Sequence, residues 1–159
     1  MVREDEIRDG LIKQFNALEG KIRIQRPRRM WAQVEASDFA SVLDYARNKQ
    51  GFVILCTMTG LDKGENLGVL YHLSREDGIM LNIEVTVPRA NPVIRTVTTV
   101  FPGADIYERE IVDLFGFKVE GLAPGFRYPL TDDWPQGQYP LRKDWKLDPS
   151  LKTGTIREE

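Results

Sequence analysis

Cysteine and histidine each occur only once in this chain of 159 residues, as Cys56 and His72. A single cysteine excludes an internal disulfide, and it excludes an iron-sulfur cluster bound by this chain alone, which typically needs about four thiolates. A protein zinc site needs about three or four ligands, and a nucleophile-histidine pair would have to use His72. We therefore expect neither a common metal site nor a catalytic triad.

Long apolar runs and a dominant charge sign are also missing. The longest apolar run, residues 52–56, is far shorter than the roughly 20 residues of a membrane-spanning helix. The net charge is -2, which gives no overall attraction to nucleic acid or anionic membrane. The N-terminus is charged from its third residue, unlike a signal peptide. These features predict a location in the cytoplasm or facing it, with no membrane span.

Both rare residues lie in strand-like stretches. Cys56 occurs in FVILCTMT and His72 in LGVLYHL. The environment predicts that Cys56 is a small buried core residue and that His72 is a hydrogen-bonded residue of a sheet. Hydrophobic residues make up 42% of the chain and charged residues 29%, which is typical of a core-forming globular protein.

Hydrophobic periodicity predicts two helices and several strands in the first half of the chain. The first helix has apolar residues at helical spacing between positions 7 and 18, and Gly20 is placed to end it. Strands are expected at 21–25 and 30–34, and a second helix begins with Ser37 as N-cap. A buried strand at 52–59 and a hairpin of 67–73 with 79–87 follow.

In the second half, residues 93–100 fit either a strand or a short helix, and Pro102-Gly103 opens a helix over 104–115 that Gly116 ends. The pattern predicts an α+β fold, with a mixed, mostly antiparallel sheet packed against helices. We expect one α+β domain at residues 1–120 and an extended segment at 121–159.

The C-terminal segment combines proline with aromatic residues. Five of the nine prolines lie beyond Gly121, which argues against regular helix or interior strand. Disordered tails are usually poor in aromatic residues, but this segment holds Phe126, Tyr128, Trp134, Tyr139 and Trp145. It is therefore expected to lie against a surface, and composition leaves open whether that surface belongs to its own domain or to a partner.

The helix at 104–115 has an apolar face and a charged face. Tyr107, Ile111, Leu114 and Phe115 are expected to pack on the sheet. Opposite them we expect Asp105, Glu108, Arg109 and Asp113, with ion pairs from Arg109 to both aspartates. Ile106 and Val112 lie at or within this charged arc, and such a mixed face suits a protein interface better than bulk water.

A basic run with a nearby tryptophan offers an alternative function. Its residues are Lys21, Arg23, Arg26, Arg28, Arg29 and Trp31. They could bind nucleic acid or lipid headgroups, or they could form the solvent-facing side of a strand. Because the whole chain is slightly acidic, an acidic protein partner is the better expectation.

Two motifs resemble the 30 kDa subunit family of respiratory complex I. One is ADIYEREIVDLFG at 104–116, and the other is LTDDW at 130–134 followed by YPLRKD at 139–144. Residues 92–102 and the strand ending Gly60-Leu61-Asp62 are similar to the family as well. The resemblance covers roughly residues 21–145.

This resemblance implies a structural subunit without flavin, metal or cluster, located on the cytoplasmic side of a membrane complex. It implies binding to a large subunit, which carries the quinone site or a nickel-iron centre, and to an adjacent iron-sulfur subunit. The residues expected to bind the partner are Asp105, Glu108, Arg109, Glu110, Asp113, Trp134, Tyr139, Leu141, Arg142, Lys143, Asp144 and Trp145.

One stretch departs from the respiratory enzymes, which usually have a glycine-histidine-proline motif and two arginines after the helix. Here residues 121–129 read GLAPGFRYP. This variant and the short chain are more similar to homologues in energy-converting nickel-iron hydrogenases and related complexes. An NADH- or ferredoxin-linked quinone oxidoreductase is the alternative within the same family.

Overall fold

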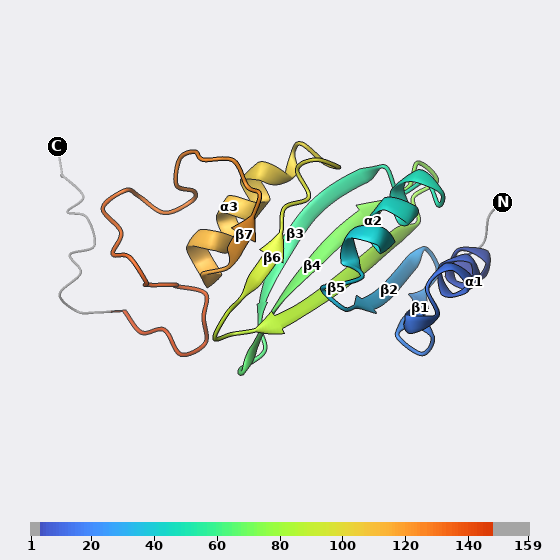
Figure 1. Cartoon of the computed structure of the whole chain (residues 1–159), viewed down its shortest axis with the longest axis horizontal. Helices are drawn as coiled ribbons and strands as arrows, with labels where there is room; N and C mark the ends of the chain where they lie inside the picture. Colours follow the sequence, from blue (N-terminus) through green and yellow to red (C-terminus); the bar gives the residue numbers. More distant parts are fainter. Residues whose placement is uncertain (1–3, 148–159) are drawn as a thin grey trace.

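The computed structural model describes residues 4–147. In chain order the elements are α1 (Glu4–Gln14), the 3-10 helix η1 (Asn16–Leu18), β1 (Ile22–Arg26), β2 (Arg29–Val34), α2 (Phe39–Asn48), β3 (Ile54–Asp62), β4 (Asn66–Ser74), β5 (Met80–Pro88), β6 (Val93–Arg95), α3 (Ala104–Phe115) and β7 (Lys118–Glu120). Figure 1 shows α1 at one end of the molecule and the segment 121–147 at the other.

Five strands form one sheet in the order β1-β2-β5-β4-β3. Strand β2 pairs with β5 in parallel, and the other three pairings are antiparallel. The parallel pair is possible because α2 and the β3–β4 hairpin supply the long connection that parallel neighbours need. Strands β6 and β7 form a separate parallel pair. The predicted α+β fold with a mixed, mostly antiparallel sheet is confirmed.

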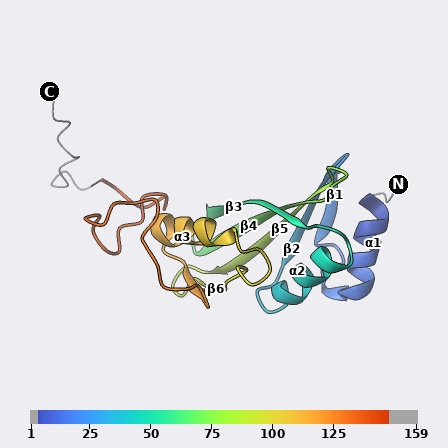
Figure 2. The same ribbon diagram turned by 90° about the horizontal axis from the view of Figure 1, so that it is seen from above.

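One part of the core lies between a face of this sheet and helices α1 and α2, which Figure 2 shows on the same side, and buried residues of α3 and of positions 94–101 extend it. Alternate residues of β2 (Met30, Ala32 and Val34) are buried, as the period of two in a half-covered strand requires. Phe39 of α2 packs on Tyr71 of β4 with ring centroids 4.4 Å apart. This contact joins α2 to strand β4.

Strand β3 differs from its prediction. It starts at Ile54, continues to Asp62, and forms an edge of the sheet, so most of its first half is exposed. Cys56 lies where the β3–β4 register shifts, and it is exposed. The prediction of a buried strand with a buried cysteine was wrong, because an apolar run does not reveal that its strand lies at a sheet edge and carries a bulge.

The prediction for His72 is confirmed. Its Nδ1 lies 2.7 Å from Oδ1 of Asn82, and its Nε2 lies 3.0 Å from the hydroxyl of Thr59. These partners come from the strands on either side of β4. The side chain is therefore held within a cross-strand hydrogen-bond chain.

Several boundaries moved. Helix α1 ends at Gln14, and η1 precedes Gly20, whose φ of 72° is left-handed. Helix α2 is preceded by Asp38 with no side-chain cap, so the Ser37 cap was wrong. The ambiguous stretch at 93–100 is a strand only over Val93–Arg95, and its pairing partner β7 was not predicted.

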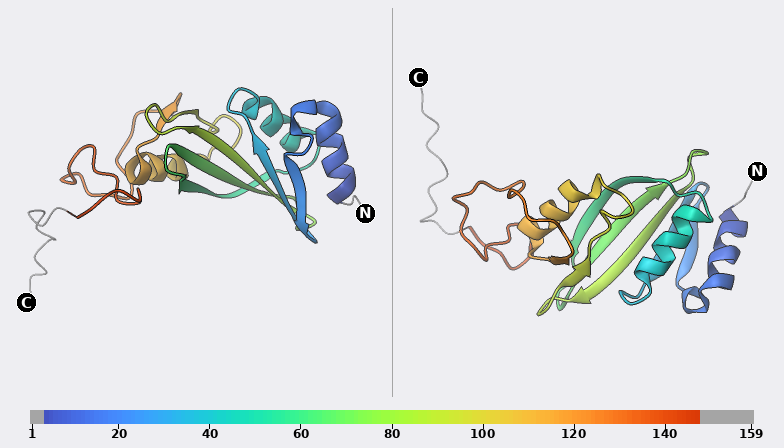
Figure 3. Two further views of the ribbon diagram at one scale, coloured as in Figure 1. Left: turned by 90° about the horizontal axis from the view of Figure 1, so that it is seen from below. Right: turned by 45° about the horizontal axis from the view of Figure 1, so that its top comes forward.

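Helix α3 lies beside β3, as Figures 1 and 3 show. A side chain at Gly60 of β3 would meet the ring of Phe115 at 2.5 Å, so glycine allows this close packing. The hydroxyl of Tyr107 donates a hydrogen bond of 3.1 Å to the carbonyl of Cys56. Beyond β7, residues 121–147 contain turns and extended chain without helix or strand. The rest of the expected segment, 148–159, lies outside the described residues.

Candidate partner-binding surface

Helix α3 turns one of its charged residues into the core. Buried residues Ala104, Glu108, Ile111 and Phe115 follow each other at intervals of three or four positions, so they share one helix face. The prediction that Glu108 lies on the charged outer face was therefore wrong. Tyr107 and Leu114, expected to pack on the sheet, are half-buried and pack against the core.

Glu108 is held by the segment that follows β6. One carboxylate oxygen accepts a hydrogen bond of 2.6 Å from the backbone N–H of Val97, and the other accepts one of 2.7 Å from the hydroxyl of Thr96. Burial raises the pKa of Glu108 above its ordinary value of 4.5, and these two hydrogen bonds oppose the rise. The side chain therefore ties α3 to the β6 connection.

Arg109 links α3 to the first part of the C-terminal segment. Its guanidinium forms hydrogen bonds of 2.8 and 2.9 Å with the two oxygens of Asp105, which lower the pKa of that carboxyl. The same group donates to the carbonyl oxygens of Ala123 (2.9 Å) and Phe126 (3.2 Å). It also lies 5.3 Å from the centre of the Phe126 ring. Arg109 thus holds residues 123–126, the first part of the C-terminal segment, against α3.

Asp113 pairs with a different arginine from the one expected. It is buried and accepts hydrogen bonds from Nε of Arg127 (2.9 Å) and the backbone N–H of Leu130 (3.2 Å). The guanidinium of Arg127 also donates a hydrogen bond of 2.7 Å to the backbone carbonyl of Trp134. The predicted Arg109–Asp113 ion pair is absent among the described residues, because Asp113 faces the chain that folds back over α3.

A third connection anchors the end of the segment. Asp62, at the end of β3, accepts hydrogen bonds from the backbone N–H of Lys143 (2.8 Å) and from Arg89 (2.8 and 2.9 Å). Arg89 also pairs with Asp144. Burial would raise the pKa of Asp62, but the N–H groups of Lys143 and Gly64 and the guanidinium of Arg89 lower it to about 2.

The C-terminus of α3 receives the middle of the segment. The backbone N–H of Leu141 donates to the carbonyl of Leu114 (3.2 Å), and Nε of Arg142 donates to the carbonyl of Phe115 (2.7 Å). These are carbonyls that a helix end leaves without partners. Arg142 also lies 4.4 Å from the centre of the Tyr139 ring. The segment therefore caps the helix.

The two tryptophans contact each other. The rings of Trp134 and Trp145 are 5.9 Å apart, and their indole N–H groups donate to the backbone and side-chain oxygens of Gln138, at 2.9 and 2.8 Å. Both rings are half-buried. Within this chain they hold the loop 134–145 closed.

Apolar side chains on the same segment point to solvent. Phe126 is 64% exposed, Leu141 52% and Leu147 51%, and Tyr128 is exposed as well. We call the surface formed by these four side chains the apolar rim. Exposed apolar residues grouped on one segment are typical of a binding surface. Of these four, only Leu141 is among the predicted partner-binding residues; Phe126 and Tyr128 were predicted only to lie against a surface, and Leu147 was not predicted.

The structure brings most of the predicted site residues to one end of the molecule. Eight of them belong to the C-terminal segment or to the residues of α3 that anchor it. They are Asp105, Arg109, Asp113, Trp134, Tyr139, Arg142, Asp144 and Trp145. Glu110 is half-buried on α3, and Lys143 is exposed. The roles of Asp62, Arg89 and Arg127 were not predicted, because they depend on contacts between distant parts of the chain.

The basic run lies on the opposite end, on β1 and β2. Lys21 forms an ion pair of 2.9 Å with Glu35, and the guanidinium of Arg23 lies 5.4 Å from the centre of the Trp31 ring. These contacts satisfy part of the run within the chain. Nucleic-acid or lipid binding there stays a prediction.

The comparison with protein families matches residues 32–150 to the family described as respiratory-chain NADH dehydrogenase, 30 Kd subunit. The matched range includes α3 and the segment that folds over it. This chain belongs to that family. Among residues 4–147, no helix is both long enough and apolar enough to cross a membrane.

Two archaeal relatives illustrate the range of the family. The membrane-bound hydrogenase subunit beta of Pyrococcus furiosus is 30% identical over 122 residues, which are 74% of this chain and 70% of the relative. A subunit of the F(420)H(2) dehydrogenase of Methanosarcina mazei is 29% identical over 145 residues, 89% of this chain and 91% of the relative.

Solved structures share the fold. A chain of the membrane-bound sulfane sulfur reductase, an archaeal respiratory membrane complex, aligns with a TM-score of 0.76 and 25% identity, covering 90% of this chain and 85% of the other. The trypsin-resistant fragment (1–134) of Nqo5 aligns with a TM-score of 0.63 and 26% identity. The alignment covers 74% of this chain and 99% of the fragment. The relatives named here are subunits of multi-subunit membrane complexes, or fragments of such subunits.

Proposed function

We propose that this chain is a non-catalytic scaffold subunit, peripheral on the cytoplasmic side of a membrane-bound redox complex. In this role it binds no cofactor of its own. It holds the large subunit and the adjacent iron-sulfur subunit, which carry the clusters, in fixed positions. Membership of the 30 kDa family supports this role, as does the likeness to hydrogenase, dehydrogenase and sulfane sulfur reductase subunits.

The apolar rim is the observation that carries the proposal. Its exposed side chains stand on a segment that three separate anchors hold, at Arg109, Asp113 and Asp62. A segment ordered in this way loses little further entropy when it binds, so more of its contact energy contributes to affinity. The large subunit is the occupant that the family resemblance implies for this end of the molecule.

The direct test is co-purification from detergent-solubilised membranes of the source organism. Replacing Phe126→Asn and Leu141→Asn together removes two exposed apolar anchors, and each anchor in an interface is worth roughly 1–2 kcal/mol or more. We expect the large subunit to be lost from the purified complex, while the melting temperature of the isolated chain stays the same. Val53→Asn with Ile54→Asn is the matched control, because those side chains are similarly exposed at the start of β3.

A second variant tests the tryptophan pair. Replacing Trp134 and Trp145 by Ala is expected to leave the α+β domain folded, because both side chains pack within the loop. It should weaken co-purification, since an open loop no longer presents Leu141 in a fixed position. Unchanged complex yield with both double variants would reject docking through this segment.

We favour hydrogenase-type complexes over NADH- or ferredoxin-linked quinone oxidoreductases because residues 121–129 read GLAPGFRYP, which departs from the glycine-histidine-proline motif usual in the respiratory enzymes. The large subunit that co-purifies decides between them. Two pairs of nickel-ligating cysteines in that subunit identify a hydrogenase, and their absence identifies a quinone- or sulfur-linked complex.

A further inference from the structure

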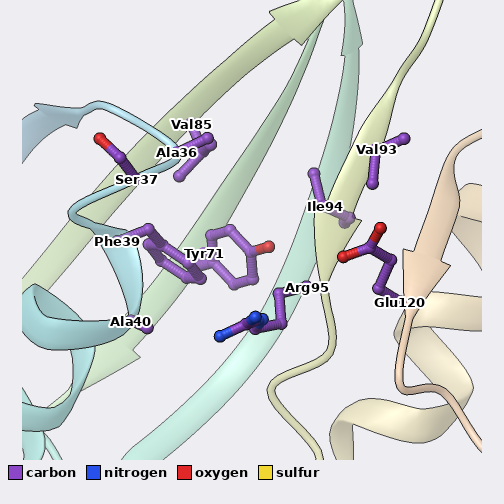
Figure 4. Close-up of a pocket in the computed structure, with 10 residues that line it drawn as sticks. All are labelled: Ala36, Ser37, Phe39, Ala40, Tyr71, Val85, Val93, Ile94, Arg95 and Glu120. Carbon is purple, nitrogen blue, oxygen red and sulfur yellow. The ribbon is translucent and has the colours of Figure 1, made fainter.

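A cavity lies away from the apolar rim, between the start of α2 and strand β6. Its volume is about 300 Å³, and apolar side chains form most of its walls. Figure 4 shows Phe39 and Val85 on one side of it and Val93 and Ile94 on the other. The volume is at the low end of the range for small-molecule pockets.

The wall of this cavity contains an unused hydrogen-bond donor. Tyr71 is 1% exposed, and its hydroxyl has no hydrogen-bond partner among the described residues. In Figure 4 the hydroxyl points away from Phe39, toward the side of the cavity formed by Ile94. Because a buried hydroxyl without a partner destabilises a protein, an acceptor oxygen placed in this cavity would be bound favourably.

The mouth carries one charge of each sign. Arg95 of β6 and Glu120 of β7 are neighbours in the strand register, and both are exposed. Within residues 4–147 neither side chain forms an ion pair or a hydrogen bond with another group. A peptide unit offers a carbonyl oxygen to an arginine and an N–H to a carboxylate. This pair of charges therefore matches the backbone of a polypeptide lying across the mouth.

We propose that this cavity receives one side chain from an extended segment of a neighbouring subunit. That side chain has an apolar stem along Phe39 and Ile94, and an acceptor oxygen at its tip that Tyr71 binds. The proposal rests on the proposed function, because it requires a partner subunit. It assigns a second contact face, separate from the apolar rim, so that two sides of this chain are held in the complex.

Photo-crosslinking in the assembled complex tests the contact. Ala40 lines the cavity and is exposed, and Ser41, also exposed on the same helix, does not line it. We expect p-benzoylphenylalanine at position 40 to crosslink to one extended segment of a co-purifying subunit, and the same residue at position 41 to give no such product. Absence of a crosslink at position 40, or equal crosslinking at both positions, would overturn the proposal.

Blocking the mouth gives a second measurement. Ala40→Trp places an indole at the mouth and should reduce retention of the partner by at least about 10-fold, as the loss of an interface anchor does. Ser41→Trp should retain the partner normally. Intact retention in Ala40→Trp together with loss in the Phe126/Leu141 variant would overturn the cavity contact alone. The reverse result would support the cavity contact and overturn docking through the apolar rim.

Tyr71→Phe separates binding from folding. It removes only the hydroxyl, so the isolated chain should melt at the same temperature or higher, because an unpaired buried polar group is lost. In the complex it should weaken partner retention by about 2- to 10-fold, the range for one hydrogen bond. A lower melting temperature with unchanged retention would overturn the proposal, as would a small molecule found in place of the partner side chain.

Discussion

Replacing Asp62 by Asn should release the end of the C-terminal segment without unfolding the domain. The side chain of Asp62 is 2% exposed, and it bonds the backbone N–H of Lys143 and the guanidinium of Arg89. Asn has the same shape but no charge, so it loses the charge-assisted part of these bonds. Hydrogen bonds to charged groups contribute about 1.5–3 kcal/mol each, and Arg89 is partly exposed, so we expect a cost of about 2–3 kcal/mol.

The assay is amide hydrogen exchange at Lys143. A cost of this size increases the opening equilibrium by roughly 30- to 150-fold, and the Lys143 amide should exchange faster by that factor. Amides of β4 and β5 should keep their protection, because the core does not involve this contact. Asp132→Asn is the control, since Asp132 is exposed on the same segment and bonds no other described group. An unchanged rate at Lys143 would refute the assignment of Asp62 as the anchor.

We also expect Asp62→Asn to change how release of the C-terminal segment depends on pH. The pKa of Asp62 is about 2 in the folded protein, below its ordinary value of 3.8. A lowered pKa means that the stabilisation is fully present above pH 3.8 and is lost as the pH falls through 2. Wild type should therefore release the segment between about pH 4 and pH 2, whereas Asp62→Asn should lack this transition.

Two further predictions concern α3. Glu108→Gln can keep the bond from Val97 and reverse the bond with Thr96, so it should change the free energy of unfolding by less than about 1 kcal/mol, whereas Glu108→Ala should cost about 3 kcal/mol. Because the folded pKa of Glu108 is raised, wild type should lose stability as the pH rises above 4.5, and urea unfolding of Glu108→Gln should show a weaker dependence. Gly116→Ala should cost about 2 kcal/mol or more in the same assay, because φ is 75° and the new methyl would meet the Tyr139 ring at 2.5 Å. Gly137→Ala has a similar φ of 77° but nothing within 4 Å, so an equal loss there would show that the contact with Tyr139 contributes nothing.

Local patterns predicted the elements that depend on local chemistry. The period-two burial of β2 and the β4–β5 hairpin with its Gly78 turn follow from the order of residues, as does the end of α3 at Gly116. The motif at 104–116 also identified the family correctly, because such a motif is a property of the sequence itself.

Sequence alone could not place residues whose environment depends on distant parts of the chain. Cys56 and Glu108 were assigned to the wrong side because an apolar or charged neighbourhood does not reveal which strand is an edge or which helix face meets β6. Arg127 and Asp62 had no local signal, since their partners are 14 and 81 positions away.

The sequence by itself therefore determined the family, the fold class and the expectation that surfaces rather than bound metals are used here, because spacing, composition and ligand counts are encoded in the chain order. Only the tertiary structure decided which of those surfaces is free. The charged face of α3 is largely occupied by the chain's own segment, whereas Phe126 and Leu141 are exposed and the cavity beside Tyr71 is open. The physical reason is that ion pairs and burial depend on which groups meet in space, and contacts between distant positions cannot be read from local sequence patterns.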